Sequence, residues 1–258
     1  MPRLLLLLCL LRALPASEAL PILRLGCDPT PPYIEMLPAE TAVGGRLGGL
    51  WVDTVQTVLA ELGQPHEPLR LTPWNRLLRM AEEGGVDGLF GITRSPERER
   101  YLRFADEPLL ADPWLVWIRN EDADRIAYTT PEDLAGHGVG LVTGYNYGED
   151  FVARLRAVAV VEEVADEQTN FRKLAARRID AVVSTLQVGT RTAAAAGLGA
   201  TVRPLHGVPV KLSVFHIAFR HDRAPAEWVA AFSDRLAAFK RTPAYAALWR
   251  RYALAGDP

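Results

Sequence analysis

The chain has 258 residues, of which 49% are hydrophobic, so it can bury one large core or two modest ones. Its formal charge of −2 excludes a general nucleic-acid-binding surface, which would need a strong basic excess. No apolar run reaches the roughly 18 residues that span a bilayer, and the sequence contains no internal repeat.

The first 19 residues predict an export signal. Arg3 gives a positive start, residues 4–11 form an apolar core, and residues 17–19 supply small residues at a cleavage site. Cleavage would remove Cys9 and leave Cys27 as the only cysteine, so no internal disulfide could form. We expect Cys27 to be a small buried residue at the end of a strand.

Strands and helices alternate along the first half of the chain, with bounds set by apolar spacing and by Gly, Pro and capping signals. In chain order we expect a strand at 22–26, an irregular turn at 28–33, a surface loop at 35–48, a helix at 54–62, a strand at 69–72, a helix from 74 that ends at Gly84, a buried strand at 86–90, a small-residue turn at 91–93, and a short helix with Ser95 as N-cap and Pro96 at its first position.

The second half alternates in the same way. We expect an extended segment at 114–119, a short helix at 130–134, a strand at 139–142, a turn at 144–148, a helix from 149, a strand at 158–164, a helix at 168–178, a strand at 179–185, an extended segment at 210–220 and helical structure over 225–254. The apolar stripe of the last segment is typical of a core-facing helix.

Two places along the chain suit an anion. Thr93, the free amide groups at Ser95 and the guanidinium of Arg98 follow the carboxyl end of a strand, where open α/β sheets place their ligands. The turn at 144–148 presents amide groups at the start of a helix, which suits a carboxylate or another anion.

The pattern G-x-x-D, T-x-x-x-x-R and F-[S/A]-x-x-P resembles the signature of family 3 extracellular solute-binding proteins, the periplasmic receptors that feed polar amino acids to ABC transporters. The matching residues are Asp87, Thr93, Arg98, Phe104, Ala105 and Pro108. The spacing to Phe104 selects Arg98, rather than Arg94 or Arg100, as the ligand arginine of the family. The alternative is that Arg98 pairs with Glu97 or Asp106 on the surface.

The resemblance implies an α/β fold of the type II periplasmic binding protein class, with two doubly wound lobes joined by a two-strand hinge. A signal peptide would occupy residues 1–19, lobe one residues 20–115 plus 213–258, and lobe two residues 116–212. A ligand in the cleft would favour the closed state, because only there does it contact both lobes.

The same resemblance implies a set of ligand-binding residues. Lobe one would contribute Asp28, Tyr33, Trp74, Gly91, Thr93 and Arg98, and lobe two Tyr145, Asn146 and Thr185. Each has an alternative structural role: Asp28 could cap a local turn, Tyr33 could pack between the lobes, and Trp74 could belong to the core.

Thr185 departs from the family pattern. Amino-acid receptors usually carry, five residues after the position of Asp180, an aspartate that holds the ammonium of the ligand. Thr185 stands there, and a buried ammonium without a carboxylate partner is costly, so a standard α-amino acid is disfavoured. Tyr145 and Tyr147 replace the usual hydroxyl residues and suggest a ligand with apolar or ring surface.

We therefore expect a monomeric periplasmic protein that captures a small carboxylate-bearing solute, an amino acid or a similar compound, and delivers it to an ABC transporter permease in the inner membrane. No metal is expected, since the five histidines lack metal-ligand spacing. No cofactor, nucleic acid or catalysis is expected either. One alternative is an enzyme like the cyclohexadienyl dehydratases, which needs a general acid in the cleft. Glu149 and Glu167 are the nearby candidates, and neither is expected at a strand end. The other alternative is a ligand sensor that docks on a membrane receptor.

Overall fold

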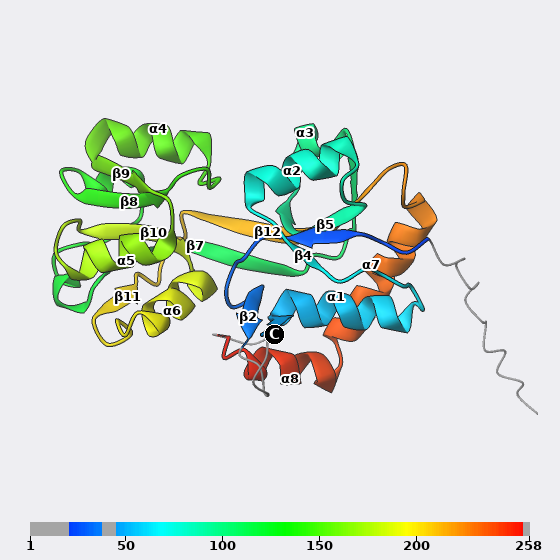
Figure 1. Cartoon of the computed structure of the whole chain (residues 1–258). Helices are drawn as coiled ribbons and strands as arrows, with labels where there is room; N and C mark the ends of the chain where they lie inside the picture. The colour runs from blue at the N-terminus through cyan, green and yellow to red at the C-terminus, as the bar shows by residue number, and fades with distance from the viewer. Residues whose placement is uncertain (1–20, 38–44, 255–258) are drawn as a thin grey trace, which may run out of the picture.

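The computed structural model describes residues 21–37 and 45–254, so the predicted signal peptide lies outside the described residues. Two α/β halves lie side by side and are joined by two long antiparallel strands, β7 (Leu110–Arg119) and β12 (Lys211–Arg220) (Figure 1). These strands correspond to the two predicted extended segments. The expected architecture, two α/β lobes with a two-strand hinge, is confirmed.

One half is built from the start and the end of the chain. Its strands are β1 (Leu25–Cys27), β4 (Arg70–Leu71), β5 (Gly88–Thr93) and β6 (Leu102–Phe104). β1 lies parallel between β4 and β5, and β12 pairs antiparallel with β5 and β6. One side of the sheet carries α1 (Leu50–Glu61), α7 (Ala226–Lys240) and α8 (Pro243–Arg251), and the other carries α2 (Trp74–Glu83) and α3 (Pro96–Glu99) (Figure 1).

The middle of the chain builds the other half. Its strands are β8 (Gly138–Val142), β9 (Val160–Val164), β10 (Ala181–Thr185) and β11 (Val202–Pro204). β8 lies parallel between β9 and β10, and β7 pairs antiparallel with β10 and β11. Its helices are α4 (Glu149–Val158), α5 (Glu167–Ala175) and α6 (Leu186–Ala195), and two short 3-10 helices span Asn120–Asp122 and Pro131–Leu134.

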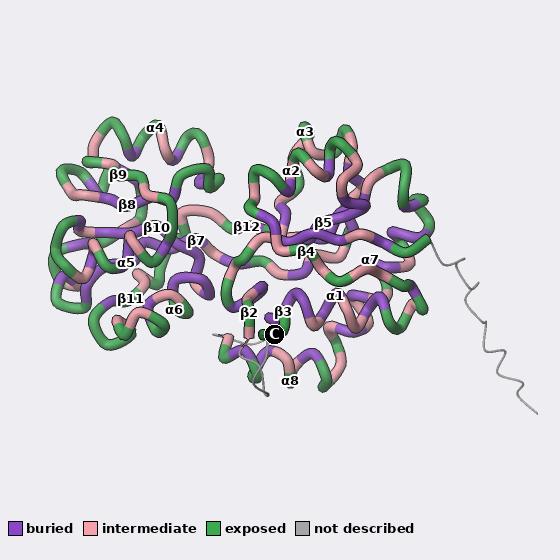
Figure 2. Tube along the Cα trace, viewed as in Figure 1, coloured by how far each residue is buried: buried purple, intermediate pink, exposed green. Residues whose placement is uncertain are grey.

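The core lies on both faces of this continuous sheet, between the strands and the helices (Figure 2). Along β10, for example, Ala181 and Val183 pack toward α4, and Val182 packs toward α5. The predicted boundaries at 115/116 and 212/213 fall within β7 and β12, which pair with strands of both halves, and they stay a prediction. None of the helices in residues 21–37 and 45–254 has the length and apolarity needed to cross a bilayer.

Elements whose sequence signals lie within a few residues of each other form as expected. α2 begins at Trp74 and ends at Gly84, which adopts a φ of 86°. The Ser95 side chain accepts a hydrogen bond from the backbone amide of Arg98, and Pro96 occupies the first helical position. Cys27 is buried at the end of β1, as expected.

Several expected elements differ from the structure. Residues 91–93 continue β5 instead of forming a turn, because β12 pairs with β5 as far as Thr93. The ladder shifts register between His216 and Ile217, opposite Gly91, whose φ of 79° suits a bulge. The expected loop at 35–48 has paired ends, β2 (Glu35–Leu37) and β3 (Arg46–Gly48), and residues 38–44 are outside the described part.

Helix bounds also differ. α1 starts at Leu50, four residues earlier than expected, after Gly49 with a φ of 119°. A Cβ on Gly49 would lie 2.2 Å from the carbonyl oxygen of Tyr33, so only glycine fits this entry. The C-terminal helical segment is two helices, because Thr242 caps α8 by accepting a hydrogen bond from the amide of Tyr245. β6, β11 and α6 were not expected.

Candidate functional site

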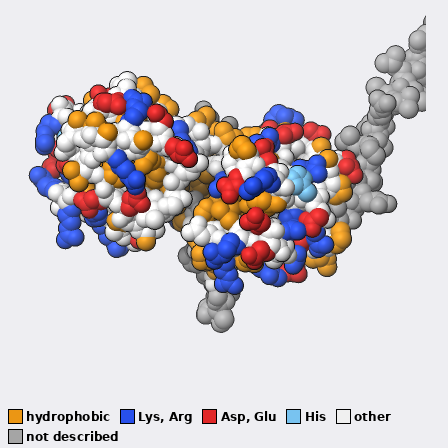
Figure 3. All heavy atoms as spheres, turned by 90° about the horizontal axis from the view of Figure 1, so that it is seen from above, with side chains coloured by type: hydrophobic (Ala, Val, Ile, Leu, Met, Phe, Trp, Pro, Cys, Tyr) orange, Lys and Arg blue, Asp and Glu red, His pale blue; other side chains and the backbone are white. Residues whose placement is uncertain are grey.

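A cavity with about 840 Å³ of empty space, open in part to solvent, lies between the two halves. All nine residues expected to bind ligand are on its lining: Asp28, Tyr33, Trp74, Gly91, Thr93, Arg98, Tyr145, Asn146 and Thr185. Viewed from above, hydrophobic side chains gather where the two halves meet (Figure 3). The fold thus brings together residues that are up to 157 positions apart, from Asp28 to Thr185.

Arg98 projects from the short helix α3 toward this cavity and is half-buried. Its Nη1 donates hydrogen bonds to the carbonyl oxygen of Thr93 at 2.7 Å and to Oγ1 of Thr93 at 2.8 Å. Its guanidinium carbon lies 5.3 Å from the ring centroid of Trp74. Burial lowers the pKa of Arg98, but an arginine stays protonated in proteins.

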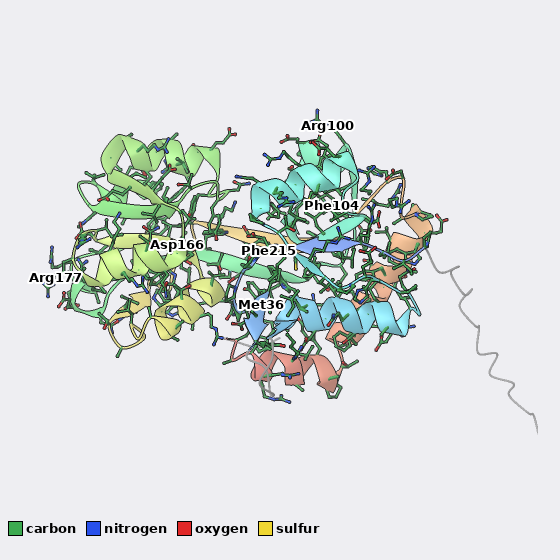
Figure 4. The ribbon with its side chains drawn as sticks, viewed as in Figure 1. Met36, Arg100, Phe104, Asp166, Arg177 and Phe215 are labelled. Atoms are coloured by element: carbon green, nitrogen blue, oxygen red, sulfur yellow. The ribbon has the colours of Figure 1, made fainter. Side chains whose placement is uncertain are left out.

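Within the described part of the chain, Arg98 forms no ion pair, and the structure gives Nε and Nη2 no hydrogen bond. The surface pairing with Glu97 or Asp106 is therefore absent, and Asp106 instead pairs with Arg94 at 3.2 Å. Arg100 lies at the outer surface, away from the junction of the halves (Figure 4). A fixed cation with unused N–H groups inside an apolar cavity is suited to bind an anion with two parallel hydrogen bonds.

Aromatic rings form a large part of the remaining wall. Tyr33 stacks on Trp51 with ring centroids 4.0 Å apart and an interplanar angle of 10°. Trp51 also contacts Phe215, which lies on β12 between the two halves (Figure 4). Trp114 of β7 lines the cavity from the opposite strand, and its Nε1 donates to Oγ of Ser213 on β12 at 2.7 Å. The two hinge strands are thus part of the cavity wall.

Sequence reasoning missed Asp112, which links the two halves through the hinge. Asp112 is 1% exposed on β7 and accepts a 2.5 Å hydrogen bond from the hydroxyl of Tyr33. Its Oδ2 also lies 3.4 Å from the amide of Gln187, and the hydroxyl of Thr185 is a further partner. Burial raises the pKa of Asp112, and the hydrogen bonds from Tyr33 and Thr185 act in the opposite direction. Tyr33 therefore has a packing role as well as a place on the cavity wall.

The loop before α4 presents one tyrosine to the cavity, not two. Tyr145 lines the cavity and is 39% exposed. Tyr147 is 3% exposed, packs edge-on against Trp114 at 4.8 Å, and accepts a 2.8 Å hydrogen bond from the amide of Val142. The expectation that Tyr147 adds aromatic surface to the cleft is wrong, because its ring belongs to the core of the middle half. Asn146 lines the cavity and accepts a hydrogen bond from the amide of Gly148.

Glu167, which the sequence does not place at a strand end, lines the cavity and is 8% exposed. It is the first residue of α5, which starts one position earlier than expected, and it follows the end of β9 by three residues. Burial raises the pKa of Glu167 to about 8. The other candidate acid, Glu149, is exposed at the start of α4 and does not line the cavity. The useful signal was the N-cap Asp166, which places Glu167 at a strand-to-helix turn.

Asp28 is the second carboxyl on the lining. Burial raises its pKa to about 6, and a hydrogen bond from the backbone of Trp74 acts in the opposite direction. Within residues 21–37 and 45–254, no group of three or more His, Cys, Asp or Glu side chains could hold a metal ion.

Comparison with known protein families shows to which family the chain belongs. The sequence profile of the bacterial extracellular solute-binding proteins, family 3, matches residues 23–255. The chain belongs to this family. Comparison with curated protein sequences gives no significant match.

Solved structures of solute-binding proteins have the same fold. A histidine kinase sensor domain similar to periplasmic binding proteins superposes with a TM-score of 0.74 at 22% identity, covering 94% of this chain and all of that one. An arginine-bound substrate-binding protein of an amino acid ABC transporter from Streptococcus pneumoniae gives 0.71 at 16%, covering 89% and 93%. A reconstructed ancestral amino acid-binding protein, a precursor of cyclohexadienyl dehydratase, gives 0.69 at 22%, covering 90% and 94%.

The signature of this solute-binding family is partly structural in the present chain. Asp87 is completely buried and accepts hydrogen bonds from Arg24 at 2.7 Å and from Arg223 at 2.8 Å. These contacts tie β1 and the segment after β12 to the start of β5. Thr93 and Arg98, by contrast, form a pair that faces the cavity.

Proposed function

We propose that this family 3 solute-binding protein captures a small carboxylate-bearing solute, an amino acid or a similar compound, in the cleft between its halves. The observation that carries the proposal is Arg98, a half-buried cation on the cavity wall with no acidic partner in the described chain. A carboxylate would complete its hydrogen bonds and neutralise its charge in an environment of low dielectric. Thr93 holds the guanidinium in place from the other side.

The ligand stabilises closure because it contacts both halves at once. Arg98, Thr93, Asp28 and Trp74 would bind it from the half that contains the chain ends. Tyr145, Asn146 and Thr185 would bind it from the middle half, with β7 and β12 as the hinge. The protein performs no chemistry in this proposal: it binds, closes and releases.

Thr185 narrows the class of solute. Its hydroxyl caps α6 by accepting a 3.4 Å hydrogen bond from the amide of Val188, and it carries no charge. The nearby carboxyl of Asp112 is already bonded to Tyr33. An α-ammonium placed at Thr185 would lose its hydration without gaining a free carboxylate from Thr185 or Asp112. We therefore infer a carboxylate without an α-ammonium.

Family membership and the predicted export signal support delivery to an ABC transporter permease in the inner membrane. The protein would act in the periplasm as a monomer, without a cofactor. A structural relative that is an amino acid ABC transporter substrate-binding protein supports this role.

Two alternative functions each have one supporting observation. Glu167 would be protonated at neutral pH in the empty cavity, as a general acid must be, and a structural relative is a precursor of cyclohexadienyl dehydratase. Another relative is a histidine kinase sensor domain, which supports a sensing role. Release of carbon dioxide from a cyclohexadienyl carboxylate, lost in Glu167→Gln, would establish the enzyme and contradict binding without chemistry.

A thermal-shift screen tests the proposal. Amino acids, dicarboxylates, aromatic acids, ω-amino acids and small alcohols are each added to the protein from which the bound solute has been removed by unfolding and refolding. A solute at 100 times its Kd stabilises the folded state by about 2.7 kcal/mol, which is a shift of several degrees in Tm. Carboxylates should give the shifts. A set of hits consisting only of compounds without an anionic group would contradict the proposal.

A further inference from the structure

A second hollow, termed the outer hollow, adjoins the cleft and has about 1530 Å³ of empty space, including space open to solvent. It shares part of its wall with the inner cavity, including Asp28, Trp74, Tyr145 and Glu167. Arg98 and Thr93 line only the inner cavity. The shared residues therefore lie where the cavity that contains Arg98 meets the outer hollow, and we call this shared wall the mouth of the cleft.

The carboxyl of Glu167 at this mouth is not fully hydrogen-bonded. The side chain is 8% exposed, and its Oε2 has no hydrogen-bond partner among the described residues. Oγ of Ser184 lies beside this carboxyl and opposes the rise in its pKa, but within the described chain the contact does not meet hydrogen-bond geometry. A buried, unpaired polar atom costs about 1–3 kcal/mol, so it needs an explanation. A ligand group that donates hydrogen bonds to this carboxyl supplies one.

The charge around the mouth is acidic. Among the described residues lining the outer hollow, the acids are Asp28, Glu35, Asp166 and Glu167, and Arg191 is the single basic residue. Arg191 is paired with Glu35 at 2.8 Å, and Asp166 is engaged in capping α5 through the amide of Thr169. Asp28 and Glu167 are thus left without a basic partner among the residues that the structure describes. They come from different halves of the protein, so a cation between them would also favour closure.

We propose that Glu167, with Asp28, forms a cation-binding subsite at the mouth of the cleft, and that the ligand is a small carboxylate with an amine or guanidinium at its far end. This inference rests on the proposed function, in which Arg98 holds the carboxylate. Because Thr185 disfavours an α-ammonium, the ligand class is the ω-amino or ω-guanidino carboxylates. The aromatic rings of Trp74 and Tyr145 line the same mouth and would add cation–π attraction to such a group.

Binding of a cation next to Glu167 and Asp28 should release a proton. Burial raises the pKa of Glu167 to about 8 and that of Asp28 to about 6 in the empty cleft. A bound cation favours the ionised carboxylate, as does the position of Glu167 at the N-terminus of α5. Binding near pH 7 should therefore release a proton, and affinity should rise as the pH increases from 6 to 8. The titratable or polar groups around Glu167 are Asp28, Tyr145, Tyr147, Asp166 and Ser184.

Calorimetry with two isosteric probes tests the subsite. The probes are 4-guanidinobutyrate and 4-ureidobutyrate, which have nearly the same shape and differ in the charge of the distal group. The wild-type protein should bind the guanidino compound at least tenfold more tightly at pH 8 and release a proton at pH 7. Glu167→Gln should abolish most of this preference and leave the affinity for the ureido compound within about threefold. Glu149→Gln, at the exposed start of α4, is the matched control and should keep the preference.

The outcomes separate this inference from the proposed function. A wild-type protein that prefers the ureido probe, or binds neither probe, overturns the cation subsite. A preference that persists in Glu167→Gln overturns the role of Glu167. If Arg98→Ala removes the binding of both probes, carboxylate capture stands even where the subsite fails. Glu167→Gln should fold, because the glutamine amide resembles the protonated acid, and a thermal melt of the empty variant checks this.

Discussion

Tyr33→Phe tests the buried link between the two halves with a single atom. The substitution removes the hydroxyl that donates to Asp112 and keeps the ring that stacks on Trp51 with centroids 4.0 Å apart. Asp112 is 1% exposed, so water does not readily replace the lost donor. Any loss of stability therefore reports on the hydrogen bond and not on ring packing.

The expected magnitude follows from the burial of Asp112. Leaving a buried acceptor without its partner costs about 1–3 kcal/mol. For a chain of this size, 1 kcal/mol corresponds to about 2–4 °C in Tm, so the variant should melt about 2–12 °C lower. The sign of the pH effect is also defined. Burial raises the pKa of Asp112 and the Tyr33 hydroxyl opposes this, so the pKa should rise further in the variant. An acid with a raised pKa loses stability as the pH rises, so the deficit should be larger at pH 8 than at pH 5.

Urea denaturation of the empty protein at pH 5 and pH 8 provides the assay. Tyr101→Phe is the matched control, because Tyr101 is half-buried and the structure gives its hydroxyl no hydrogen bond within the described chain. If Tyr33→Phe is as stable as Tyr101→Phe at both pH values, the proposed link between the halves is refuted.

Three further predictions concern shape, acid stability and specificity. A saturating ligand should reduce the radius of gyration by closing the halves about β7 and β12, and superimposable scattering profiles would contradict a hinge. Asp87 has a pKa lowered to about 2, since hydrogen bonds from Arg24 and Arg223 outweigh its burial. Wild-type stability should therefore fall by about 2 kcal/mol between pH 4 and pH 2, and Asp87→Asn, measured by acid titration, should lack this step while being less stable at pH 7. Thr185→Asp should create or strengthen binding of α-amino acids in calorimetry and weaken the native ligand, whereas the neutral Thr185→Asn should not. Micromolar binding of glutamine, arginine or histidine by the unmodified protein would show that Thr185 does not exclude them.

The parts of the fold that could be predicted depend on interactions between near neighbours. The start and end of α2 and the Ser95 cap of α3 are determined within four residues, so the sequence pattern shows them directly. The strand character of residues 91–93 depends on pairing with β12, more than 120 positions away, and small residues read in isolation favour a turn.

The site follows the same rule. Arg98 and Thr93 are close in sequence and carry the family signature, so they could be named in advance. Asp112 and Glu167 have no local signal of burial. Only the packing of distant segments buries Asp112 against Tyr33 and makes Glu167 part of the cavity. The prediction for Tyr147 is wrong for the opposite reason. Its neighbour Tyr145 faces the cavity, but the loop turns Tyr147 toward Trp114 and the core.

The central claim is that Arg98 anchors the carboxylate of a ligand in the cleft, and calorimetry of Arg98→Ala tests it most directly. Arg94→Ala is the control, because Arg94 pairs with Asp106 on the surface and does not line the cavity. With a carboxylate from the thermal-shift screen, Arg98→Ala should lose about 2–5 kcal/mol of binding free energy, and Arg98→Lys should recover only part of it. Arg94→Ala should bind like the wild type. Equal affinities of Arg98→Ala and the wild type for that ligand would contradict the claim.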